Sequence, residues 1–324
     1  MVKYTKILID EMRSLASMTS YGVDRPMKDT DVVSEYGATP VVLILLWKLL
    51  CPHLTSNSKP HHMLWWLYQC KHYPTKAILQ KVLRVSAPTS RLAMAPIKEA
   101  FIKIRNKVVS PRIVSTHLKN KHSSHSFPPF SPTEIQQIRF ENRLKEDKGK
   151  TCKIYHDGVD FKCFNRRNPE QENRPEWRRY PFDPSYHSHK FKAAGLRYGV
   201  STCIQTGEIV SCHGPFKARK WADITIYRKH VKPMLRPGEM VEADAGYHAD
   251  GTVRGPSDYC CQSEKSAKKK VAGRHETING RLETFRCLRH QFRHNHHQHK
   301  FYFYTAAVTT QLMLRKYGTY SCSY

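Results

Sequence analysis

The sequence predicts an α/β protein in which a helical N-terminal region precedes a domain with a mixed β-sheet and flanking helices. Apolar residues recur at helical spacing through the first hundred residues, and strand-like alternation begins only after Lys150. A segment rich in Ser, Pro, His and Lys, residues 117–133, separates these two textures and is typical of a linker. We therefore expect a helical region over residues 1–116, a linker with a short charged helix over 117–150, and an α/β domain over 151–324.

Composition points to a polyanionic partner. The chain has 324 residues, enough for about two domains, and its 40% hydrophobic content supports a packed core. Its 54 lysines and arginines outnumber 27 acidic residues, which gives a formal net charge of +27. Because neutralising phosphates releases condensed counterions, nucleic acid is the partner that such a charge favours.

Cysteine spacing and hydropathy exclude several other classes. Ten cysteines occur without a CxxC pair, which argues against a zinc ribbon or a disulfide scaffold and favours reduced thiols in an intracellular protein. Residues 1–20 have no continuous apolar core, so we expect no signal peptide. The most apolar run, residues 41–50, is about half the length that a bilayer requires, so we expect a buried helix and no membrane partner.

The N-terminal region contains a candidate helix-turn-helix. Apolar helices are expected over residues 41–50 and 61–73, and the segment 74–104 then reads as two helices joined by a Ser-Ala-Pro turn. Two ordinary core helices with such a turn would give the same pattern. The segment is therefore either a DNA-reading helix-turn-helix or a pair of core helices. Its basic residues, which are candidate DNA contacts, are Lys76, Lys81, Arg84 and Arg91.

The C-terminal domain is expected to alternate between strands and helices. A hairpin is predicted by two β-rich runs that flank Gln205-Thr206-Gly207. The expected strands cover residues 153–164, 196–204, 208–212 and 240–243, and the expected helices cover 221–235, 268–288 and 301–315.

Three acidic residues stand out by their positions. Asp157 lies in a predicted strand and precedes Gly158, Asp244 ends another strand, and Glu276 lies in a predicted helix among basic neighbours. Hard divalent cations prefer carboxylate oxygens, and two such cations can activate an attacking oxygen and stabilise a leaving one during phosphodiester cleavage. Asp160 is the rival to Asp157, but three residues along a strand it points to the opposite face.

From residue 138 to residue 312 the chain resembles the Harbinger-like DDE superfamily endonucleases, which are transposases. The matching segments occur in order along more than half of the chain. They are FENR (140–143), HDGVDF (156–161), SHKFKAAGLRYGV (188–200), TGEIVSCHGPF (206–216), EADAGY (242–247), RHETINGRL (274–282) and FRH (292–294). Outside this range, QCKHYPTKAIL (69–79) resembles a segment that precedes the family's helix-turn-helix.

The resemblance implies an RNase H-like catalytic domain that cleaves DNA by two-metal-ion catalysis. Asp157, Asp244 and Glu276 match the family's catalytic carboxylates, which hold two Mg²⁺ or Mn²⁺ ions in this chemistry. The freed 3′-hydroxyl would then attack target DNA. Asp223 matches an accessory aspartate of the family, and Glu242 shares a strand face with Asp244. A DNA-binding protein derived from a transposase that no longer cuts is the alternative.

The resemblance also implies partners and a location. The enzyme would act in the nucleus on double-stranded DNA, at the ends of a mobile element and at its target. A Myb-like helper protein and a second copy of the chain are further candidate partners. This chain shows no tryptophan-repeat Myb pattern of its own.

Basic residues around Glu276 are candidate phosphate contacts. The lysine run before that residue is equally typical of a nuclear localisation signal or of a solvated helix face. The histidine-rich stretch 290–299 favours a basic DNA-facing surface, with zinc as the weaker interpretation. The candidate phosphate contacts are Lys268, Lys269, Lys270, Arg274 and Arg281.

Overall fold

The computed structural model describes residues 6–106, 138–144, 151–165, 182–247, 250–259 and 261–318. The expected linker at 117–133 lies outside these residues. Of the charged helix expected at its end, only the 3-10 turn η2 (Phe140–Leu144) is described. The N-terminal region consists of α1 (Lys6–Tyr21), α2 (Asp29–Tyr36), α3 (Pro40–Leu50), η1 (Cys51–His53), α4 (Pro60–His72), α5 (Lys76–Leu83) and α6 (Ala87–Asn106).

Proline, glycine and threonine set the bounds of these helices. Pro40 and Pro60 occupy the first positions of α3 and α4, where the missing backbone N–H has no intrahelical acceptor to lose. Gly37 ends α2 in the left-handed conformation, with φ of 78°. Thr75 caps α5 by accepting a hydrogen bond from the backbone of Ile78. The two helices expected at 74–104 are therefore present as α5 and α6.

The C-terminal domain is built on one mixed sheet of six strands. Long strand β1 is central: β3 pairs antiparallel with it on one side and β5 pairs parallel with it on the other. Next to β3 lies β4, antiparallel, and next to β5 lies β6, parallel. The strands are β1 (Cys152–Lys162), β2 (His187–Ser188), β3 (Ala193–Cys203), β4 (Ile209–Lys217), β5 (Met240–Glu242) and β6 (Val253–Arg254). The expected strands and hairpin are thus confirmed.

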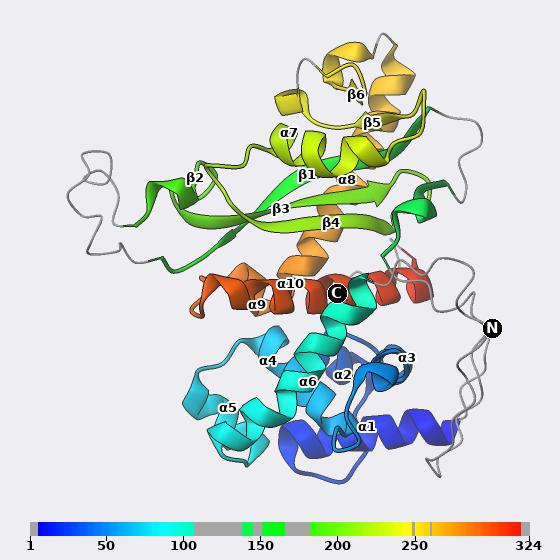
Figure 1. Cartoon of the computed structure of the whole chain (residues 1–324). Coiled ribbons are helices and arrows are strands. Elements are labelled where there is room, and N and C mark those ends of the chain that lie inside the picture. Colours follow the sequence, from blue (N-terminus) through cyan, green and yellow to red (C-terminus); the bar gives the residue numbers. More distant parts are fainter. Residues whose placement is uncertain are drawn as a thin grey trace.

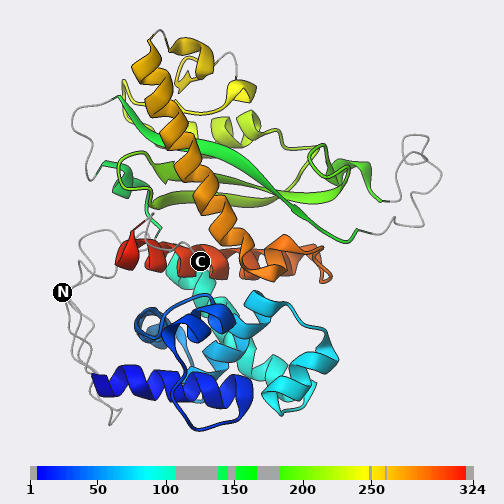
Figure 2. The same ribbon diagram turned by 180° about the vertical axis from the view of Figure 1, so that it is seen from behind.

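Helices cover both faces of this sheet. Short α7 lies on one face, and the long helix α8 crosses the other face until it reaches α10 (Figures 1 and 2). Both α8 and α10 begin five or six residues earlier than the sequence pattern indicates. The remaining elements are η5 (Pro184–Tyr186), α7 (Asp223–Ile226), η6 (Tyr227–Val231), η7 (Lys232–Met234), η8 (Ala245–Tyr247), η9 (Pro256–Asp258), α8 (Gln262–Glu283), α9 (Arg286–Arg289) and α10 (His296–Tyr317).

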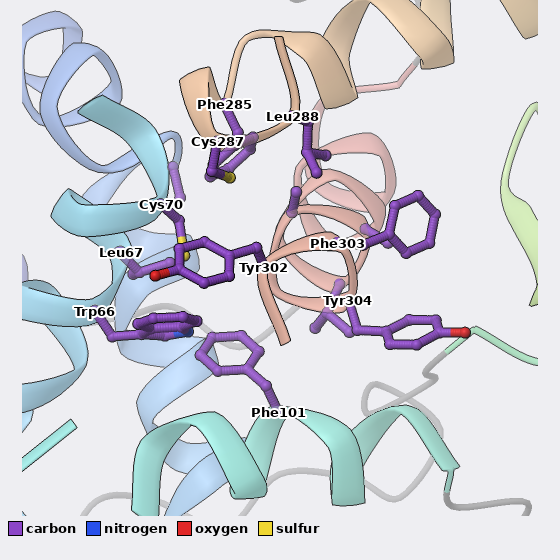
Figure 3. Packing of buried hydrophobic residues seen from close by; sticks show 14 of the residues in the cluster. Trp66, Leu67, Cys70, Phe101, Phe285, Cys287, Leu288, Tyr302, Phe303 and Tyr304 are labelled. Carbon is purple, nitrogen blue, oxygen red and sulfur yellow. The ribbon is translucent and has the colours of Figure 1, made fainter. Parts of the chain in front are cut away.

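Helix α10 is buried between the sheet and the N-terminal helices, and every residue from Phe301 to Leu314 is buried. On the sheet side, Phe303 stacks on Tyr198 with ring centroids 3.7 Å apart. On the other side, Thr305 accepts a hydrogen bond of 2.8 Å from Trp66 of α4. Figure 3 shows Phe303 pointing to one side of α10, with Trp66 of α4 lying on the other side. One apolar cluster therefore runs from α1 through α10 to the sheet, and the N-terminal helices have no core separate from it.

Within the described residues, no single helix is long and apolar enough to cross a membrane. Helices α2 and α3, extended by η1, meet the length and composition criteria only as a pair bent by 48°.

The shared core predicts a single unfolding transition. Phe101 of α6 is fully buried in it, so Phe101→Ala should cost about 3–5 kcal/mol of unfolding free energy and shift the helical and sheet signals together. Leu92 of the same helix is 74% exposed, so Leu92→Ala should change stability by less than about 0.5 kcal/mol. Denaturant titrations followed by circular dichroism and by tyrosine fluorescence measure both. Two separate transitions would contradict the shared core.

Candidate active site

The parallel pairing of β1 and β5 brings two of the three expected carboxylates to neighbouring positions. Tyr155 of β1 is in register with Glu242 of β5. Two residues further along each strand direction stand Asp157, still within β1, and Asp244, two residues past the end of β5. The expected strand position is confirmed for Asp157, whereas Asp244 lies just beyond the strand that it was expected to end.

Glu276 reaches the same region from α8. Its neighbour His275 is buried against the sheet, where its Nδ1 lies 3.1 Å from the Thr202 hydroxyl and its ring contacts Tyr155 at 5.0 Å. Because one residue along a helix rotates the side chain by about 100°, fixing His275 inward leaves Glu276 exposed at the edge of the contact.

Electrostatics shows that the carboxylates act on one another. Burial, together with the negative charges of Asp244, Asp223 and Glu276, raises the pKa of Asp157 to about 7, against a hydrogen bond from the backbone N–H of Gly158 that lowers it. The site therefore concentrates negative charge in a protein whose overall charge is strongly positive. A cation would relieve this repulsion.

Asp223, at the start of α7, lies against the backbone of β1 at Gly158, the residue that follows Asp157. A Cβ atom built on Gly158 would lie 1.6 Å from Oδ1 of Asp223. Only glycine therefore allows this carboxylate to contact the backbone of β1. Burial raises the pKa of Asp223 to about 6, although the charge of Arg197 opposes the rise. Close packing of Asp223 thus explains why a glycine follows Asp157 in β1.

Arg197 of β3 holds Asp223 and Asp160 together. Its guanidinium makes hydrogen bonds of 2.6 and 2.9 Å with the Asp160 carboxylate, which also accepts a 2.6 Å bond from Ser188. Nη1 of the same arginine lies 3.2 Å from Asp223 Oδ1, an ion contact without hydrogen-bond geometry. Asp160, the rival to Asp157 in the sequence, is therefore a buried ion-pair partner on the opposite face of β1. Arg197 is not among the residues that the sequence motifs indicate, although a charged residue within an otherwise apolar strand is a signal for such a role.

Both aspartates of the expected pair accept local backbone hydrogen bonds. Asp157 Oδ1 accepts from Gly158 at 2.7 Å, and Asp244 Oδ1 accepts from Gly246 at 2.8 Å. Among the described residues, no group of three His, Cys, Asp or Glu side chains is arranged so that it could hold a metal ion as it stands. Asp244 also lines a cavity of about 580 Å³ together with Tyr247.

The lysine run before Glu276 divides into two kinds of residue. Lys269 and Lys270 are exposed and accessible to a phosphate. Lys268 is buried instead, and its Nζ donates hydrogen bonds of 2.8 and 3.0 Å to the carbonyls of Ala243 and Arg254. Lys268 therefore joins α8 to the end of β5, and the expectation that it contacts DNA is corrected to a role in placing Asp244.

The two arginines of α8 also make contacts within the protein. Arg274 Nη1 donates to the carbonyls of Ile204 and Gln205, at 2.6 and 3.2 Å, in the hairpin between β3 and β4. This anchoring contact is a structural role that the sequence does not indicate. Arg281 Nη1 donates to the Gly318 carbonyl at 3.3 Å, and the side chain also lines a cavity at the C-terminal end of α8.

The basic residues of the candidate helix-turn-helix lie on the surface. Lys76, Lys81, Arg84 and Arg91 are all exposed. One of them is engaged locally, since Arg84 donates a 2.9 Å hydrogen bond to the Tyr21 carbonyl. The geometry leaves the other three accessible to a polyanion.

The histidine-rich stretch does not form one basic surface. His299 is buried, its Nδ1 lies 2.8 Å from the Tyr198 hydroxyl, and burial lowers its pKa to about 3. His294 stacks on Tyr302, and His296 lies 3.0 Å from the Phe164 carbonyl. The expectation of a DNA-facing histidine surface is wrong for His299, because the helical period turns this residue toward the sheet.

Comparisons of the chain with models of known protein families, with curated proteins and with solved structures found no match.

The contact between Gly158 and Asp223 predicts a measurable coupling. Gly158→Ala should cost about 1–3 kcal/mol of unfolding free energy, because the new methyl group displaces the Asp223 carboxylate. In an Asp223→Ala background the same substitution should cost less than about 0.5 kcal/mol. Gly251→Ala is the control, because a Cβ atom there meets nothing within 4 Å. Equal costs of Gly158→Ala in both backgrounds, from urea unfolding, would contradict the contact.

Proposed function

We propose that this chain is a divalent-metal-dependent DNA endonuclease of the DDE transposase type, with Asp157, Asp244 and Glu276 as its catalytic carboxylates. The observation that carries the proposal is the parallel register of β1 and β5, which brings Asp157 and Asp244 to neighbouring positions, where the charges of Asp244 and Glu276 both raise the pKa of the partly buried Asp157. These residues come from a central strand, the end of its parallel neighbour and a helix that crosses the sheet.

The sheet supports an RNase H-like assignment for the C-terminal domain. An antiparallel meander, β1-β3-β4, is extended on the other side of β1 by β5 and β6, both parallel to it. A helix then follows β6 and returns across the sheet (Figure 2). Strand order, strand directions and the placement of the last acidic residue on that helix all agree with the fold that the resemblance implies.

The donor set suits a hard divalent cation. Asp157, Asp244 and Glu276 offer carboxylate oxygens only, which are the ligands that Mg²⁺ and Mn²⁺ prefer. Asp157 and Asp244 would exchange backbone N–H partners for such a cation. When bound, the cation would activate an attacking oxygen and stabilise the leaving oxygen of a phosphodiester.

The surrounding residues position these carboxylates. Lys268 fixes the end of β5 just before Asp244, and buried His275 fixes the rotation of α8 that exposes Glu276. Arg197 holds Asp223 close to the backbone of β1. A negatively charged centre alone would repel DNA. The net charge of +27 on the whole protein would instead attract it.

A DNA-binding protein without nuclease activity is the second candidate. It is favoured by the local hydrogen bonds that Asp157 and Asp244 make to their own loops in place of a preformed metal site. Both candidates require DNA binding, and only the first requires metal-dependent cleavage.

A nicking assay separates the two candidates. Asp244→Asn is nearly isosteric but removes the charge that would hold a divalent cation, so cleavage of labelled DNA with Mg²⁺ or Mn²⁺ should fall by about 100-fold or more. DNA binding should survive, because the substitution removes one negative charge from a surface that faces phosphates.

The control for this assay is Asp24→Asn, which makes the same chemical change at an exposed residue of the N-terminal region. It should cleave as the wild type does. Equal nicking by wild type and Asp244→Asn would remove Asp244 from the site. Wild-type protein that binds DNA carrying the element ends without cutting it would favour the second candidate.

A further inference from the structure

A cavity of about 750 Å³ opens where the N-terminal helices meet the C-terminal end of α8. Its walls come from α2, α4, α8, α9 and α10, so it lies at the junction of the N-terminal helical region and the C-terminal domain. On one wall, Gly37 passes so close to the ring of Phe285 that an added Cβ atom would lie 2.5 Å from it. On another, Gly280 leaves open space, because an added Cβ atom would meet nothing within 4 Å.

The lining of this cavity is strongly basic. Lys71, Arg281, Arg286 and Arg289 all line it, and the lining contains no Asp or Glu. The nearby carboxylate of Glu35 lies 3.2 Å from His72 Nε2.

Lys71 shows the consequence of this arrangement. Burial, together with the charge of Arg286, lowers its pKa to about 8, while Cys287 and Glu35 oppose the change. Its Nζ lies over the Phe285 ring at 5.3 Å. The neighbouring guanidinium disfavours the charged form of this amine. An anion bound between the two groups would stabilise that charged form.

The cavity continues the exposed side of α8 that carries Glu276. Gly280 is four residues after Glu276, so the two lie on the same side of the helix, about 6 Å apart along its axis. Thr277, between them, also lines the cavity. A strand that places one phosphate near Glu276 can therefore place a neighbouring part of its backbone against the basic lining, with only small side chains between.

We propose that this cavity binds the phosphate backbone of the DNA on which the acidic centre acts. Lys71, Arg286 and Arg289 are its principal contacts. This inference rests on the proposed function for the identity of the ligand, but DNA binding can be measured without catalysis. It assigns the junction of the two regions, rather than the exposed face of α5 and α6 alone, as a DNA contact.

Gly280→Glu tests the site by adding a negative charge without removing a contact. Open space beside Gly280 accommodates the side chain, and replacing a glycine inside a helix should not weaken α8. Gly280→Gln is the matched control, with nearly the same shape and no charge. We expect the Glu variant to bind labelled duplex DNA about tenfold more weakly than the Gln variant at 100 mM salt, measured by fluorescence anisotropy in EDTA. Equal affinities of the two variants would overturn the inference.

A salt titration provides a second measurement. Arg286→Gln combined with Arg289→Gln should reduce the slope of log affinity against log salt by about 2, because two phosphate contacts are lost. The control, Lys59→Gln with Lys103→Gln, removes the same charge from exposed residues outside the cavity and should leave the slope nearly unchanged. Equal slopes for both double variants would count against the site.

Failure of this inference can be distinguished from failure of the proposed function. If the wild type nicks DNA while all cavity variants bind it normally, the endonuclease stands and the cavity is not its DNA site. If the cavity variants lose affinity while the wild type never nicks, the cavity binds DNA and the catalytic proposal fails.

Discussion

The candidate site depends on the central position of β1. Strands β3 and β5 pair with its two edges, and helices cover both of its faces, so its residues alternate between a face covered by α7 and a face covered by α8. Parallel pairing with β5 brings Asp244 beside Asp157, whereas an antiparallel partner would carry its last residue away. The same strand gives Asp160 to the opposite face, where Arg197 neutralises it.

Strand and helix positions could be predicted from sequence because they follow from local periodicity. The hairpin between β3 and β4 and the two helices at α5 and α6 are examples. The fate of individual charges could not be predicted in the same way. Lys268, Lys269 and Lys270 are chemically identical neighbours, yet only the first is turned toward β5 by the rotation of α8. Likewise, the apolar residues of α10 predict that this helix is buried. They do not predict that the sheet covers one side of it and the N-terminal helices the other.

The candidate site is predicted in part by resemblance and in part by chemistry. Asp157, Asp244 and Glu276 are singled out in the sequence, and the structure brings their charges within reach of one another. Arg197 could not be assigned from sequence, because its function depends on contacts with Asp160 and Asp223 from separate elements. Glycine at 158 has a local reason only once Asp223 is placed beside it.

The double-sided burial of α10 has a consequence for the order of events during synthesis. Trp66 and its hydrogen-bond partner Thr305 are separated by 239 residues, so α4 emerges from the ribosome long before the helix that completes its surroundings. Until then, the apolar side of the early helices has no native cover, and contacts of such long range form slowly. The nascent chain therefore has to keep this surface from aggregating until α10 has been made.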